Sequence, residues 1–152
     1  VENLEYCNIA PSSVLISKEI LNQVQNDGEF FDEALDVCED YDLFLRVTCK
    51  YKVGLIDKKL IIKYAGHEDQ LSFKYWGMDR FRVVVLEKLL LEIPSQAEND
   101  SVFKSSFRAT TRNLIIQTLI KKYTLLIKGA IKYDKIQDIK NYEEKLNLYA
   151  HA

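Results

Sequence analysis

The fold of this chain depends most on residues Phe31 to Arg46, which read FDEALDVCEDYDLFLR. Apolar side chains recur at intervals of three and four residues from Asp40 to Tyr51, and this spacing predicts a helix over that range. Asp40 and Asp42 would lie in its first turn, where carboxylates meet free backbone N–H groups and the positive end of the helix dipole. The acidic stretch therefore predicts a loop that leads into a helix.

The segments on either side of this stretch predict short elements of both kinds. Before it, Pro11-Ser12-Ser13 marks a helix start, and the helix is expected to end near Asp27-Gly28, since glycine accepts the positive φ of a helix end. After it come two runs with β propensity, Lys52–Ile56 and Leu60–Tyr64. These runs predict an antiparallel pair or two edge strands.

The second half of the chain predicts helices only. A long amphipathic helix is expected from Leu71 to Glu92, and Pro94 ends it. After the polar linker Ser95–Asp100, helical spacing continues to the C-terminus and indicates a helical hairpin or bundle. We therefore predict an α+β fold that is mostly helical, with a first domain over residues 1–94 and a helical extension over residues 95–152.

Size and composition indicate a globular protein. The chain has 152 residues, 47% hydrophobic and 29% charged, enough for one ordinary domain. No run reaches the roughly 18 uninterrupted apolar residues of a membrane span. Because the sequence opens at Val1 without a signal segment, we expect a piece of a longer protein. The three cysteines form no C-x-x-C motif, which favours reduced thiols in a cytoplasmic protein.

The charges are unevenly distributed along the chain. Seven acids and no base lie between Glu29 and Asp42, and seven bases and no acid lie between Val102 and Tyr133. Two lysine and arginine stripes follow from the helical spacing, one with Lys104, Arg108 and Arg112 and the other with Lys121, Lys128 and Lys132. A basic helix can lie on an anionic membrane or hold a lipid-diphosphate acceptor. We favour the alternative, a solvated face or one paired with the acidic loop.

Few residues are candidates for catalysis. The chain contains two histidines and neither a phosphate-binding glycine loop nor a G-x-S-x-G or H-E-x-x-H motif. A nucleic-acid partner is not expected, since the net charge is −2 and no groove-reading motif occurs.

The motif F-D-E followed by E-D-Y-D-L-x-L-R resembles the C-terminal half of the catalytic domain in the family-two glycosyltransferases, which have the GT-A fold. The segments from Ser12 to Lys18, Gly66 to Ser72 and Trp76 to Arg82 are similar to the same family, and the last two to a bacterial branch. The resemblance covers about Ile9 to Leu90. It implies that the first domain is the acceptor-side, C-terminal remnant of a GT-A α/β domain with short strands.

The resemblance also implies an inverting sugar transfer with Asp40 as the base. A carboxylate in hydrogen-bond reach can take the proton of an acceptor hydroxyl as that oxygen attacks the anomeric carbon. Glu39 would hydrogen-bond the acceptor. The alternative is that Asp40 only caps the helix. Asp42 is expected to form a structural ion pair with Arg46, four residues further on.

His67 is the second candidate site residue. By the same resemblance it would help to bind the divalent metal, Mn²⁺ or Mg²⁺, or the diphosphate of the donor. A loop histidine bonded to backbone is the alternative. Neighbouring Glu68 and Asp69 are more simply explained as helix-capping acids than as metal ligands.

The full-length enzyme would transfer a sugar from a nucleotide-sugar donor to a glycan or lipid-linked acceptor, in the synthesis of a surface polysaccharide. It would work in the cytoplasm, with peripheral contact to the inner membrane face through the basic helix. The chain lacks an Asp-x-Asp metal motif in a strand-end context, so we expect it to hold no metal and to be inactive alone. Uncovered apolar surface would favour homo-oligomers. The rival hypothesis is a helical interaction module over Ser101–Ala152, in which the acidic motif is only structural.

Overall fold

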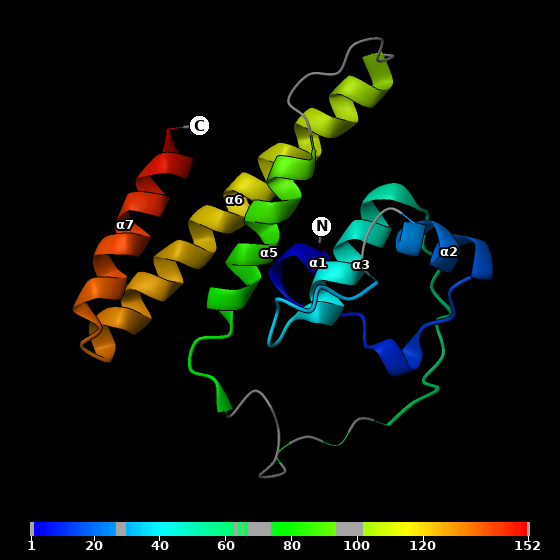
Figure 1. Ribbon diagram of the computed structural model, residues 1–152, viewed down its shortest axis with the longest axis horizontal. Helices are drawn as coiled ribbons and strands as arrows, with labels where there is room; N and C mark the ends of the chain where they lie inside the picture. The colour runs from blue at the N-terminus through cyan, green and yellow to red at the C-terminus, as the bar shows by residue number, and fades with distance from the viewer. Residues whose placement is uncertain are drawn as a thin grey trace. The chain divides into compact units, whose positions relative to one another are not determined.

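The computed structural model of the chain describes residues 2–26, 30–62, 64, 66, 74–93 and 102–151. Its elements are α1 (Glu2–Glu5), the 3-10 turn η1 (Pro11–Ser13), α2 (Lys18–Asn26), α3 (Glu39–Lys50), α5 (Asp79–Glu92), α6 (Val102–Lys132) and α7 (Ile136–Ala150). Figure 1 shows this series of helices. The chain divides into two compact units, Glu2–Met78 and Asp79–Ala152, and each is described by itself.

The predicted strands are absent from the residues that the structure describes, so the α+β fold and the remnant of a GT-A domain with short strands are wrong. Residues 52–62 run as irregular chain, and their one backbone hydrogen bond joins Lys58 N to Ile56 O at 2.8 Å. A strand is stable only when a neighbour pairs with its backbone and covers its apolar side chains. Here Leu55 and Ile62 remain 88% and 81% exposed. The described fold is helical.

The first unit is organised around α2 and α3. Val24 of α2 packs with Leu43 and Val47 of α3. Ile20, Phe30 and Tyr51 surround this small core. The helix predicted around Asp40–Tyr51 is α3, displaced by one residue at each end. The helix predicted after Pro11 begins later, because Pro11–Ser13 forms a separate 3-10 turn and α2 starts at Lys18.

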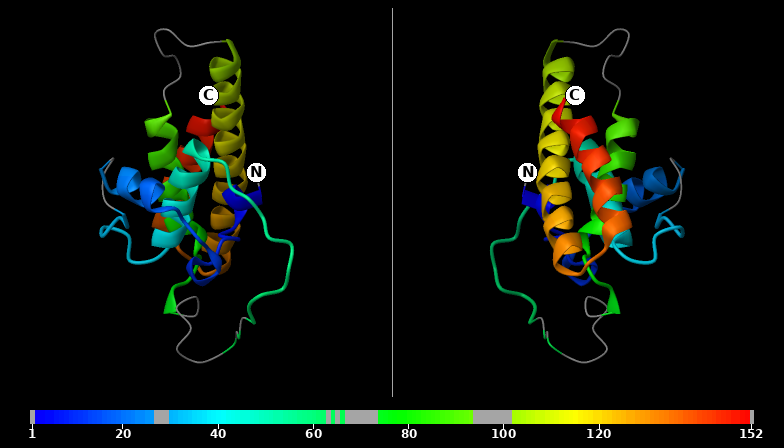
Figure 2. Two further views of the ribbon diagram at one scale, coloured as in Figure 1. Left: turned by 90° about the vertical axis from the view of Figure 1, so that its right-hand side faces the viewer. Right: turned by 90° about the vertical axis from the view of Figure 1, so that its left-hand side faces the viewer.

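The second unit consists of three helices that lie side by side, with α6 antiparallel to both α5 and α7 (Figures 1 and 2). Its core is aliphatic with one tyrosine, and comprises Val83, Val85, Leu86, Leu89, Ile115, Leu119, Tyr123, Leu126 and Ala130. The predicted hairpin of α6 and α7 is present, and α6 continues through Gly129 without a break. No helix in the described chain is both long enough and apolar enough to cross a membrane.

The helix predicted to run from Leu71 to Glu92 does not run unbroken. Residues 75–78 are not helical, and α5 begins at Asp79. Gly77 has a φ of 61°, in the left-handed region that a right-handed helix excludes. The start of the predicted helix, residues 71–73, lies outside the described residues. Gly77 therefore interrupts the helix that the hydrophobic spacing predicts as continuous.

The turn between α6 and α7 satisfies its own backbone. Lys135 N donates to Ala130 O at 2.9 Å, and Asp134 N donates to Ile131 O at 3.2 Å. Asp134 has a φ of 53°. These two bonds around a left-handed residue form a Schellman motif, which pairs carbonyls that would otherwise be left free at a helix end. The motif fixes the reversal that places α7 beside α6.

Polar contacts fix the three helices of this unit to one another. The carboxylate of Glu87 on α5 accepts hydrogen bonds from Tyr123 of α6 at 2.8 Å and from Tyr149 of α7 at 2.9 Å. Lys145 of α7 pairs with the same carboxylate at 3.0 Å. At the C-terminal end of α5, Arg112 donates to the carbonyls of Leu90 and Ile93. Its positive charge there also opposes the negative end of the helix dipole.

Candidate functional site

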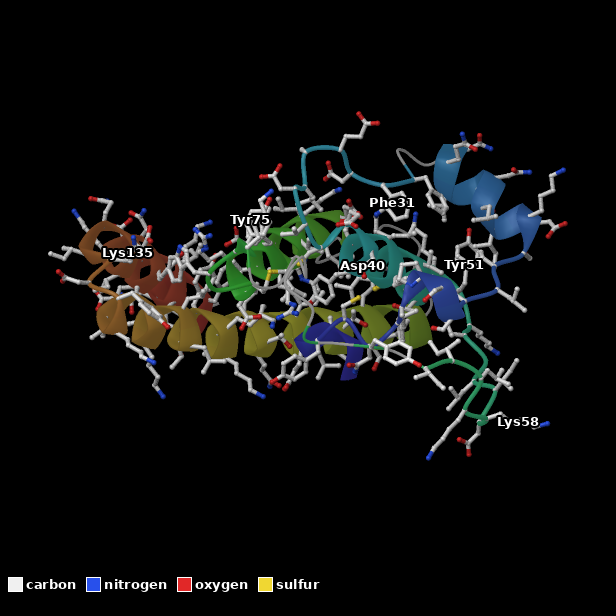
Figure 3. The ribbon with its side chains drawn as sticks, turned by 90° about the horizontal axis from the view of Figure 1, so that it is seen from below. Phe31, Asp40, Tyr51, Lys58, Tyr75 and Lys135 are labelled. Atoms are coloured by element: carbon white, nitrogen blue, oxygen red, sulfur yellow. The ribbon has the colours of Figure 1, made fainter. Side chains whose placement is uncertain are left out.

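The candidate site lies at the start of α3, where Cys38 precedes the helix in a left-handed conformation with a φ of 70°. The first helical bond runs from Asp42 N to Cys38 O at 3.0 Å. The side chain of Cys38 makes no capping hydrogen bond. Glu39 and Asp40 are the first two residues of the helix. Figure 3 labels Asp40 at this end of α3 and Tyr51 just past the other. The turn thus presents two adjacent carboxylates at a helix N-terminus.

Asp40 is held partly by its own helix. Its Oδ1 accepts the backbone N–H of Tyr41 at 2.7 Å. The side chain is partly buried, as is that of Glu39. A carboxylate bonded to a first-turn N–H stabilises the helix end, so the local role expected of a capping residue is present. This contact leaves the carboxylate further acceptor capacity, because an ionised carboxylate has about four lone-pair positions.

The other polar residues of the motif have structural partners. Asp42 is 2% exposed and its Oδ2 accepts from Nε of Arg46 at 2.8 Å, which confirms the ion pair expected from the spacing. Arg46 also donates through Nη2 to the carbonyl of Phe30 at 3.0 Å. Arg46 therefore joins the beginning of the acidic stretch, at Phe30, to α3. A buried pair of this kind is strongly destabilised when either partner is removed.

Tyr41 anchors the N-terminal segment to the same helix. Its side chain is fully buried, and its hydroxyl donates to the carbonyl of Leu4 in α1. Leu4 is itself buried. Since a buried phenol requires a partner for its hydroxyl, this bond determines where residues 2–9 run.

Cys7 is a neighbour of Asp40 that the sequence did not reveal. Burial, and after it the charge of Asp40 and a hydrogen bond to its side chain, together raise the pKa of the Cys7 thiol to about 12. Cys7 Sγ also lies 3.5 Å from the carbonyl of Ile9. The thiol is therefore a protonated donor at neutral pH. Nothing in its sequence spacing indicates this, because the contact spans 33 residues.

The loop before α3 is structured by short-range bonds. Oδ1 of Asp32 accepts the backbone N–H of Ala34 at 3.0 Å, and Leu35 N donates to Asp32 O at 3.1 Å. These contacts form a turn closed by the aspartate side chain. Asp32 therefore has a local structural role.

His67, with Glu68 and Asp69, lies outside the described residues, so its predicted role in binding a metal or diphosphate stays a prediction. Elsewhere in the described chain, no group of three or more histidine, cysteine, aspartate or glutamate side chains is arranged to hold a metal ion. The described side chains therefore form no site for a divalent metal.

A second charged cluster lies in the other unit. Asp79 accepts from Lys122 at 2.7 Å and from Arg82 at 3.0 Å. The pair of Asp79 and Arg82 joins residues three apart on one face of α5. The contact with Lys122, which is only 3% exposed, could not be read from spacing. Because the carboxylate of Asp79 bonds to both cations, this cluster is better explained as structure than as a site.

Among the residues that the structure describes, the geometry favours Glu39 and Asp40 at the start of α3 as the candidate site. Compared with models of protein families, with curated proteins and with solved structures, the chain has no match.

Proposed function

We propose that this chain supplies the acceptor-side residues of an inverting glycosyltransferase, which moves a sugar from a nucleotide-sugar donor to a hydroxyl acceptor. One observation carries the proposal. Within the motif from Glu39 to Arg46, the residues from Tyr41 onward are buried or paired, whereas Glu39 and Asp40 remain partly accessible at the helix start. Their partial exposure supports the proposal, because a base must be reachable by the acceptor.

In the proposed reaction, Asp40 takes the proton of the acceptor hydroxyl as its oxygen attacks the anomeric carbon. The bond from that carbon to the nucleoside diphosphate breaks, and the diphosphate leaves with the electron pair. A single displacement inverts the anomeric configuration. The N–H of Tyr41 bonds to Oδ1 of Asp40 and so helps to orient the carboxylate, as a positioned base requires. Glu39 accepts a hydrogen bond from the acceptor.

The donor side of the proposed enzyme is a nucleotide-binding half that acts together with this chain. A divalent metal would there neutralise the diphosphate as it leaves. The chain by itself is expected to bind nucleotide sugars poorly. Calorimetric titration with UDP- and GDP-sugars in the presence of Mn²⁺ tests this part, and micromolar binding by the isolated chain would contradict it.

The decisive experiment compares Asp40→Asn with wild type in the full-length protein, using transfer from a panel of nucleotide sugars. Loss of a positioned base costs about 10²- to 10⁴-fold in rate. Glu33→Gln is the matched control, since Glu33 is an exposed acid of the preceding loop. The proposal predicts loss of transfer in the first variant, unchanged transfer in the second, and unchanged circular dichroism in both. Equal turnover in all three proteins would refute the role of Asp40.

The rival proposal is a helical interaction module. It is favoured by the second unit, in which α5, α6 and α7 share an aliphatic core and a network around Glu87. In that case Asp40→Asn would leave function unchanged, and the function would be lost with surface substitutions on α6 or α7.

A further inference from the structure

Residues 52–62, which follow α3, carry a concentration of exposed aliphatic side chains, and we call them the exposed segment. Every residue in it is exposed. Its aliphatic side chains are between 50% and 88% exposed, and they are Val53, Leu55, Ile56, Leu60, Ile61 and Ile62. Figure 3 labels Lys58 within this segment and Tyr51 just before it. Contiguous apolar surface of this kind marks a site of interaction.

The backbone of the exposed segment narrows the choice of partner. Within its described residues the one backbone hydrogen bond joins Lys58 N to Ile56 O. A partner that covers the aliphatic side chains must also pair with the peptide groups, because burial of unpaired peptide groups is costly. A lipid surface would leave these groups unpaired, and a nucleic acid would leave the aliphatic side chains in water. The edge of a β-sheet meets both requirements, since it offers a row of N–H and C=O groups beside pockets for side chains.

The charges of the exposed segment argue against a second copy of this chain as the partner. Residues 52–62 contain three lysines and one acid, which are Lys52, Lys58, Lys59 and Asp57. Two copies of the segment paired with each other would bring like charges together, and like charges on facing strands are destabilising. Acidic side chains on the partner would instead form opposite-charge pairs with the lysines.

We propose that the exposed segment docks by strand addition on the edge of a β-sheet that carries acidic side chains and belongs to a partner outside residues 1–152. In this chain by itself the segment is irregular, and its peptide groups become paired only against the partner's edge strand. In an extended chain Leu60 and Ile62 point to one side and Ile61 to the other, so both faces of the added strand bury aliphatic surface. The inference does not depend on the proposed transferase activity.

The test uses the whole chain, with a short synthetic peptide of alternating valine and glutamate as the sheet-edge probe. The peptide carries a fluorophore for polarisation measurements and isotope-labelled carbonyls for infrared spectroscopy. We expect saturable binding and the amide I band of paired strands in the labelled peptide. A second peptide has the same sequence with N-methyl groups on two adjacent central residues, which block both edges of the strand. It should bind more weakly by about tenfold or more, because it cannot make the ladder of hydrogen bonds.

Charge reversal in the chain tests the acidic character of the partner. Lys58→Glu with Lys59→Glu should weaken binding of the glutamate peptide by about tenfold, because two opposite-charge pairs become like-charge pairs. The same variant should bind a valine and lysine peptide more tightly than wild type does. The matched control, Lys128→Glu with Lys132→Glu, makes the same change at exposed positions of α6 and should leave both affinities unchanged. Circular dichroism checks that both variants keep their helices.

Four results would overturn the proposal. The first is the absence of saturable binding to the glutamate peptide. Equal binding of the N-methylated peptide would indicate recognition of side chains without strand pairing. Equal loss in the two charge variants would assign binding to net charge instead of the exposed segment. Sedimentation of the chain alone as a dimer that Ile61→Asn with Ile62→Asn dissociates would assign the segment to a second copy.

Discussion

The ion pair between Asp79 and Lys122 gives the sharpest stability prediction, because its two members are not equally replaceable. Asp79→Asn removes the carboxylate that pairs with the ammonium of Lys122, whose side chain is 4% exposed. Removing one partner of a buried pair costs about 3–5 kcal/mol, and the 21% exposure of the Asp79 side chain reduces this to about 2–3 kcal/mol. Lys122→Met leaves Asp79 paired with Arg82 and partly solvated, and should cost about 1 kcal/mol.

The assay is urea unfolding followed by far-ultraviolet circular dichroism, with hydrogen exchange of α6 to identify the transition that changes. In the double variant the two costs should not add, and the coupling should be about 1–2 kcal/mol. If Asp79→Asn costs no more than Lys122→Met, the asymmetry is absent and the reasoning from burial is wrong.

The same pair predicts a pH dependence. Burial raises the pKa of Asp79, but hydrogen bonds and charges of Lys122 and Arg82 outweigh it, so the net pKa is lowered. A carboxyl with a lowered folded pKa contributes stability that is present above the unfolded value, about 3.9, and is lost as the pH falls through the folded value. The wild type should therefore lose this stability in acid, below about pH 4. In the same assay, the free energy of unfolding of Asp79→Asn should fall less steeply as the pH is lowered below about 4.

Three further predictions concern single contacts. Asp134→Gly should stabilise the second unit by about 1 kcal/mol, because glycine adopts the left-handed conformation of the Schellman turn without strain; an unchanged or lower thermal midpoint would contradict this. Glu87→Ala should cost about 2 kcal/mol and accelerate hydrogen exchange in α5, α6 and α7 together, since it removes the acceptor of all three side chains bonded to it. Cys7 should react with iodoacetamide at about pH 9 far more slowly than an ordinary thiol, because burial first and Asp40 second raise its pKa. Asp40→Asn should speed that reaction with Cys49 as the internal reference, and equal rates in both proteins would show that the two side chains do not interact.

Much of the helical part of the fold could be predicted from the sequence, because helix spacing is local. The range of α3 and the hairpin of α6 and α7 follow from apolar periodicity, and the ion pair of Asp42 and Arg46 follows from their four-residue spacing. The prediction of strands over residues 52–64 was wrong, because strand formation is not a local property of the sequence. β propensity describes side chains that fit a sheet, and pairing depends on residues far away in sequence.

The candidate site could be predicted only in part. Motif resemblance indicated Glu39 and Asp40, and the structure places both at the helix start. Cys7 and the role of Tyr41 as an anchor for α1 could not be found, because both contacts join segments more than 30 residues apart. The interruption before α5 was missed because hydrophobic spacing carries no signal of the positive φ at Gly77.

The exposed segment over residues 52–62 has a consequence for the behaviour of the chain in concentrated solution. Leu60, Ile61 and Ile62 form a short window of high β propensity, the kind that stacks into cross-β fibrils. Lys58 and Lys59 directly precede it. In a stack of identical chains these ammonium groups would repeat about every 4.8 Å, and their repulsion would grow with each added copy. Flanking charges of this kind oppose such stacking, so neutralising Lys58 and Lys59 is expected to raise the tendency of this segment to aggregate.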